Sequence, residues 1–103
     1  MGKRLDMLEK LAGADNADAF AFYALALEYR REGRAAEAMA TFEKLRDRDA
    51  DYLPMYLMAG ELFAEQGREG DARTWFETGI ALATRKGDSK TRGELEAALE
   101  RTL

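Results

Sequence analysis

The chain has 103 residues, of which 47% are hydrophobic and 35% are charged, and it contains no Cys and no His. This balance is typical of a compact soluble domain and excludes disordered, collagen-like and disulfide-stapled classes of protein. Without His or Cys, the chain cannot use Ser-His-Asp or Cys-His catalysis, a thiol redox couple or the usual zinc ligands. Catalysis would have to rest on carboxylates, Lys, Tyr or hydroxyl groups, and we expect no enzyme, no catalytic residue, no cofactor and no metal.

The charge balance argues against two kinds of partner. Sixteen Lys and Arg against twenty Asp and Glu give a formal net charge of −4, so the long-range field repels nucleic acid and anionic membrane surfaces. The apolar run 52–60 is much shorter than the roughly 20 residues of a membrane-spanning helix. The first residues lack the apolar core of a signal peptide. We expect a cytoplasmic protein that neither binds nucleic acid nor inserts into a membrane.

Apolar periodicity predicts helices along the whole chain. Segment 3–12 is the first, and a second stripe recurs at i, i+3, i+4 and i+7 from Phe22 to Tyr29. Gly33 interrupts the pattern, and a third stripe runs from Ala38 to Leu45. These stripes predict two antiparallel helices joined at Gly33. We interpret the charged cluster at this junction as a solvated helix face: Arg30, Arg31 and Arg34, interleaved with Glu28, Glu32 and Glu37.

The second half of the chain repeats this plan at a constant offset of 34 residues. Phe42 recurs as Phe76, and the junction Gly33 recurs as Gly67. A helical hairpin of this length cannot bury its own apolar stripe, so such units stack into a solenoid. Pro54 is suited to the first turn of the third major helix. Small residues let the helices approach closely: Ala26, Ala38, Gly60, Ala72 and Gly79.

This pattern resembles the tetratricopeptide repeat as found in small bacterial proteins, with repeats at 19–52 and 53–86. The residues that carry the resemblance are Phe22, Leu25, Ala26, Tyr29, Ala38, Phe42, Leu45 and Ala50, then Tyr56, Ala59, Gly60, Phe63, Ala72, Phe76, Gly79 and Thr84. The closing Pro is missing from both repeats. The resemblance implies an all-α fold, a right-handed α-solenoid of antiparallel helix hairpins, in a single domain spanning 1–103.

The two ends of the chain each supply one further helix. In segment 3–12, Leu8 and Leu11 share the register of Phe42 and Leu45, so this segment is predicted to be the second helix of a hairpin whose first helix is missing. Asp88 is expected to cap a final helix over 88–102. The apolar stripe of that helix is Leu95, Ala98, Leu99 and Leu103. We expect both end helices to be solubilising caps with polar outer faces.

Two motifs that suggest chemistry have simpler interpretations. The acidic run 47–51 opens like a calcium loop, but Tyr52 replaces the required Gly. Glu61 and Glu65, one helical turn apart, suggest an acid and base pair. Such a pair is more often neutralised by a neighbouring Arg or Lys.

The resemblance implies a peptide-binding groove lined by the first helix of each repeat. The residues it assigns to the groove are Phe20, Tyr23, Leu27, Arg30, Leu57 and Glu61, and the final helix would add Thr91 and Leu95. The expected function is a protein-binding adaptor or scaffold that holds an apolar or amphipathic segment of a partner protein. Two alternatives remain open: Phe20 and Tyr23 pack against the end helices, or the chain self-assembles through those helices into a homodimer or a head-to-tail oligomer.

Overall fold

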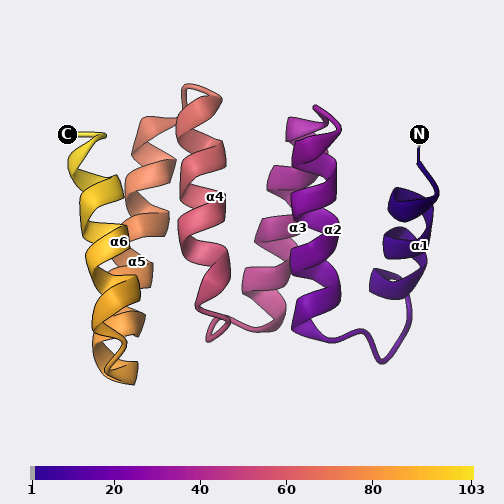
Figure 1. Ribbon diagram of the computed structural model, residues 1–103, viewed down its shortest axis with the longest axis horizontal. Helices are drawn as coiled ribbons and strands as arrows, with labels where there is room; N and C mark the ends of the chain where they lie inside the picture. The colour runs from indigo at the N-terminus through magenta and orange to yellow at the C-terminus, as the bar shows by residue number, and fades with distance from the viewer. Residues whose placement is uncertain (1) are drawn as a thin grey trace. The chain divides into compact units, whose positions relative to one another are not determined.

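The computed structural model describes residues 2–103, and within that range it contains six α-helices and no strand (Figure 1). The all-α class and the helical hairpin repeats are therefore confirmed. No helix in this range is long and apolar enough to cross a membrane. The chain divides into two compact units, the first ending at Ala50 and the second beginning at Asp51. The helices are α1 (Lys3–Ala12), α2 (Ala19–Arg31), α3 (Ala35–Arg48), α4 (Pro54–Glu65), α5 (Glu69–Lys86) and α6 (Ser89–Glu100).

The first unit contains a hairpin of α2 and α3, with α1 packed against α2. Helix α2 begins where the Asp18 carboxylate accepts a hydrogen bond from the backbone N–H of Ala21 at 2.9 Å. It ends at Arg31, and Gly33 follows with a φ of 77°, the left-handed conformation that glycine adopts without strain. The N–H of Arg34 donates to the carbonyl of Tyr29 at 2.8 Å, completing a Schellman turn. The turn reverses the chain and lets α3 pack back along α2.

The second unit repeats this hairpin with α4 and α5 and adds α6. Pro54 is the first residue of α4, as predicted. Gly67, with φ of 78°, repeats the turn made by Gly33. The predicted cap of the last helix is also confirmed, because the Asp88 carboxylate accepts from the N–H of Thr91 at 3.0 Å and from its hydroxyl at 2.8 Å. The Thr91 hydrogen bonds lower the pKa of Asp88.

Close approach of the helices depends on the predicted small residues. A Cβ added to Gly60 of α4 would lie 2.2 Å from the Phe76 ring of α5, and one added to Gly79 would lie 2.6 Å from Cβ of Tyr56. Ala26, Ala38 and Ala72 are fully buried. The role predicted for these positions is therefore confirmed.

Three expectations about the end helices are wrong. Leu11 shares the register of Leu45, yet it is 51% exposed whereas Leu45 is fully buried. The outer face of α1 is not wholly polar either, because Met7 is 53% exposed. In the described part of the first unit, α1 packs against α2 on one side, and this leaves Met7 and Leu11 facing outward. The predicted place of Leu103 in the apolar stripe of the last helix is also wrong, because Leu103 lies beyond the end of α6 and is 86% exposed.

Candidate functional site

A pocket of about 500 Å³ on the first unit brings together three of the six predicted site residues. Phe20, Tyr23 and Leu27 project from successive turns of α2 and line it. Phe20 is 63% exposed, and Tyr23 and Leu27 are half-buried. The other lining residues are Arg4, Ala24, Glu28 and Arg31. The pocket therefore combines an apolar wall with a charged rim.

Tyr23 serves both the pocket and the core. Its ring meets the ring of Phe42 edge-on, with centroids 6.5 Å apart, and Phe42 is fully buried. This contact fixes the direction of the Tyr23 side chain, because edge-to-face aromatic pairs have a preferred geometry. The large apolar surface of Phe20 is left open to a ligand.

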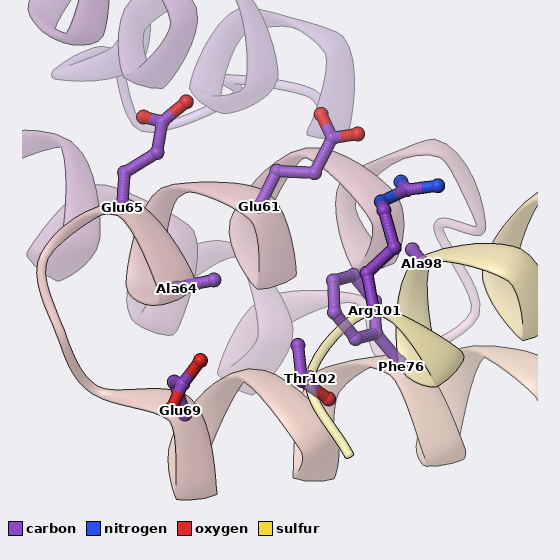
Figure 2. Close-up of a pocket in the computed structure, with 8 residues that line it drawn as sticks. All are labelled: Glu61, Ala64, Glu65, Glu69, Phe76, Ala98, Arg101 and Thr102. Atoms are coloured by element: carbon purple, nitrogen blue, oxygen red, sulfur yellow. The ribbon is translucent and has the colours of Figure 1, made fainter.

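A second pocket, of about 350 Å³, lies on the second unit between α4, α5 and α6 (Figure 2). Its lining is Glu61, Ala64, Glu65, Glu69, Phe76, Ala98, Arg101 and Thr102. Glu61 and Glu65 project from α4 on the same side, and Arg101 extends beside Glu61 (Figure 2). Arg73 holds the chain after α6 in place by donating to the carbonyl of Thr102 at 2.9 Å. This pocket is largely acidic and is suited to orienting a charged segment.

The comparisons with known proteins agree with this architecture. A family model described as the tetratricopeptide repeat matches residues 21–52. The crystal structure of a tetratricopeptide repeat domain protein from Salinibacter ruber is 35% identical in sequence. The match covers 82% of this chain and 96% of that one, with a TM-score of 0.78. The chain belongs to the tetratricopeptide repeat family.

Two further solved structures share the fold at lower identity. PcrH from Pseudomonas aeruginosa is 20% identical, with 95% of this chain and 75% of that chain covered and a TM-score of 0.86. BPP2914 from Bordetella parapertussis is 24% identical, with 99% and 89% covered and a TM-score of 0.82. The comparison with curated proteins gives no significant match.

The remaining predicted residues are placed differently on the tetratricopeptide hairpins. Arg30 on α2 and Leu57 on α4 are half-buried and lie outside the linings of the two pockets described above. Leu95 is fully buried, with side-chain atoms 3.0 and 3.2 Å from where a Cβ on Gly79 would lie. Its expected place in a ligand groove is therefore wrong, because Leu95 packs α6 onto α5.

Glu28 was not predicted, although it organises the pocket on α2. It is only 4% exposed, so its place in a solvated helix face is wrong. Its carboxylate accepts from Arg31 NH2 at 2.7 Å and from Arg4 Nε of α1 at 3.0 Å. The hydrogen bond from Arg31, followed by that from Arg4, lowers the pKa of Glu28. Glu28 thus joins α1 to the wall of the pocket.

A second polar link holds α1 in place on the repeat. The hydroxyl of Tyr29 donates to Glu9 Oε2 at 2.5 Å, and the Arg34 guanidinium lies 4.9 Å from the Tyr29 ring centroid. The hydrogen bond to Glu9, together with burial, raises the pKa of Tyr29 to about 12. When the phenol ionises, its hydroxyl has no proton left to donate, so the hydrogen bond to Glu9 is lost. The phenolate of Tyr29 then faces the carboxylate of Glu9, and the two negative charges repel each other.

The hydrogen bond between Tyr29 and Glu9 predicts that the chain loses stability at alkaline pH. Because the pKa of Tyr29 is higher in the folded chain than in the unfolded one, its contribution is fully present below about pH 10 and is lost as the pH rises from about 10 to about 12. Tyrosinate absorbance is expected to show a component that titrates at about pH 12 and that Tyr29→Phe removes. In urea unfolding over this range, Tyr29→Phe is expected to show a shallower fall in stability than the wild type. Parallel curves for the two proteins would contradict the assignment.

Proposed function

We propose that this tetratricopeptide repeat protein is a non-catalytic adaptor that binds an apolar or amphipathic segment of a partner protein on the exposed face of α2. The observation that carries the proposal is the pocket lined by Phe20, Tyr23 and Leu27. A large aromatic side chain that is 63% exposed beside a pocket is the kind of anchor that protein interfaces use. The cytoplasmic location expected from the sequence stays a prediction.

The rim of the pocket defines the chemistry of the ligand. Arg4 and Arg31 both pair with the single carboxylate of Glu28, and their side chains are 65% and 67% exposed. The two guanidinium groups share the buried carboxylate of Glu28, and Arg31 also lies 3.7 Å from a carboxylate oxygen of Glu32, so the rim offers exposed N–H donors beside paired charges. The ligand that fits carries an apolar side chain for the wall and an acidic or carbonyl oxygen for the rim. We assign Leu57 and the acidic side chains around Glu61 on the second unit to a separate contact with the same partner.

Peptide binding by a structural neighbour supports this proposal. PcrH has been crystallised in complex with the chaperone-binding regions of PopD and of PopB. Both complexes match the present chain with TM-scores of 0.86 and 0.85 at 20% identity. A closely similar backbone therefore accepts segments of other proteins. The residues of the present chain set a ligand preference of their own.

The test is to make Leu27 polar and to measure partner capture. Leu27→Glu places a charge on the apolar wall of the pocket, and we expect it to abolish recovery of the partner from the native extract. Leu99→Glu is the matched control, since Leu99 is also a half-buried helical leucine but lies on α6. Circular dichroism checks that both variants remain folded. Equal recovery with Leu27→Glu and the wild type would contradict the proposal.

Self-assembly through the end helices is the second candidate. The exposed apolar side chains of Met7 and Leu11 on α1 favour it. It requires a mass that rises with protein concentration, which sedimentation equilibrium measures directly. A strict monomer at high concentration would exclude self-assembly.

A further inference from the structure

The outward side of α1 is an apolar surface that the adaptor role does not use. Met7 and Leu11 are one helical turn apart and are about half exposed. They belong to the first unit, as does Phe20. An apolar stripe on an otherwise charged helix indicates a missing packing partner.

The repeat register identifies that missing partner as a helix. At the 34-residue offset, Met7 corresponds to Thr41 and then to Trp75 of α5. The Trp75 ring lies 5.7 Å from the ring of Tyr56 and 5.8 Å from that of Phe63, and both of these residues are on α4. This register position therefore faces the first helix of its own hairpin.

Leu11 leads to the same conclusion. At the same offset it corresponds to Leu45 and then to Gly79 of α5. Gly79 packs so closely on α4 that an added Cβ would lie 2.6 Å from Cβ of Tyr56. Helix α1 has the register of a second helix, and the described residues supply no first helix for it. Met7 and Leu11 thus mark the place that a first helix occupies in a complete hairpin.

A pocket of about 300 Å³ between α1 and α2 continues this surface. Its apolar lining includes Leu8 and Leu11 on the α1 side and Ala17, Phe20, Ala21 and Ala24 on the α2 side. A helix lying along Met7 and Leu11 would have this pocket beside it for one large apolar side chain. The surface thus offers both a stripe and an anchor point, as helix-in-groove recognition requires.

The charged side chains nearest the stripe are positive, but Asp6 adjoins the two lysines on one flank, Arg4 on the other flank is paired with Glu28, and Asp18 lines the adjoining pocket. Lys3 and Lys10 lie one turn before and one turn after Met7, and Arg4 lies one turn before it on the other flank. All three are exposed. The acidic Glu9 lies on a different side of α1, where it accepts the hydrogen bond from Tyr29. A ligand on the stripe therefore meets Lys3 and Lys10 first, and we call these two lysines the basic border.

We propose that this face of α1 binds an amphipathic helix of another protein whose apolar stripe is bordered by acidic residues. The basic border disfavours a second copy docking α1 against α1, because like charges would meet. The α6 of a second copy fits poorly too, since Lys90 and Glu94 occupy the register of Tyr56 and Gly60, which pack against α5. The α1 stripe lies on a different helix from Leu27, while the pocket beside the stripe shares Phe20 and Ala24 with the α2 pocket.

The experiment uses two designed helical peptides that share one leucine stripe, bordered by Glu in one and by Lys in the other. Fluorescence anisotropy on the full chain is expected to show tighter binding of the acidic peptide, by about tenfold or more at low salt. Leu11→Glu is expected to weaken that binding at least about tenfold. Lys10→Glu changes an exposed side chain and is expected to reduce the preference for the acidic peptide. Leu27→Glu is measured as well, to detect peptide binding in the α2 pocket, and Leu99→Glu on α6 is the control that is expected to leave the binding unchanged.

The same measurements can overturn the proposal. Equal affinity for the two peptides would show that the basic border does not select the ligand. Unchanged binding by Leu11→Glu would show that the stripe is not the binding site. Loss of acidic-peptide binding in Leu27→Glu but not in Leu11→Glu would place the peptide in the α2 pocket instead. A dimer in sedimentation that Leu11→Glu dissociates would show that a second copy covers this face. If Leu27→Glu does not change partner capture, the α2 proposal fails by itself. The expected preference for the acidic peptide, and the effects of Leu11→Glu and Lys10→Glu on it, stay the same.

Discussion

Replacing Phe76 with Ala is expected to lower the free energy of unfolding by about 3–5 kcal/mol. Phe76 is 1% exposed, and its ring lies directly against Gly60, so its removal leaves a cavity between α4 and α5. Domains of this size have about 5–15 kcal/mol of stability in total. The substitution therefore removes a large share of it. Phe42, which holds the same register in the first repeat and is fully buried, is expected to behave alike.

Phe20→Ala is the matched control for this prediction. It deletes the same atoms from a side chain that is 63% exposed, and we expect the stability to change by no more than about 0.5 kcal/mol. Urea unfolding followed by circular dichroism measures both variants. Similar losses for Phe20→Ala and Phe76→Ala would show that burial does not distinguish these two phenylalanines and would contradict the core assignment.

The helices and their turns could be predicted because their signals are local. Gly33 and Gly67 interrupt two apolar stripes at the same register, and each makes the left-handed turn that the interruption suggests. Asp88 could be predicted as a cap because its hydrogen-bond partner is only three residues away. Such features depend on a few neighbouring residues, which the linear sequence displays directly.

Glu28 could not be predicted, because its environment comes from a distant part of the chain. Locally it belongs to an alternation of acidic and basic residues that is typical of solvent-exposed helices. It is buried because α1 folds across α2 and brings Arg4, 24 residues earlier, to its carboxylate. A pairing between residues this far apart leaves no periodic trace in a single sequence.

The exposure of Leu11 shows a related limit of the repeat pattern. The 34-residue register correctly relates Leu11 to Leu45, but burial depends on which helices surround a position. Leu45 is fully buried, whereas the described first unit has no helix on the outward side of α1. In the α2 pocket, by contrast, Phe20, Tyr23 and Leu27 come together as predicted, because one helix carries all three.

Gly60→Ala is expected to destabilise the chain, whereas Gly93→Ala is expected to stabilise it. Both glycines lie inside helices, where Ala is intrinsically favoured by about 1 kcal/mol. At Gly93 an added Cβ meets nothing within 4 Å, so the substitution should gain about 0.5–1 kcal/mol. At Gly60 the same Cβ would lie 2.2–2.8 Å from three atoms of the buried Phe76 ring. Overpacking of this kind costs about 1–3 kcal/mol, and so close a contact belongs at the upper end of that range.

The opposite signs of these two changes test how tightly α4 and α5 pack. Because the clash involves one ring, adding Phe76→Leu to Gly60→Ala should cost less than the sum of the two single changes. Urea unfolding of the four proteins in this cycle measures the coupling between positions 60 and 76. If Gly60→Ala stabilised the chain as Gly93→Ala is expected to do, the two helices would have room for a methyl group. The packing of α4 on α5 would then not require a small residue at position 60. The tightest contact of the hairpin would no longer explain why the 34-residue pattern predicts stacked helices.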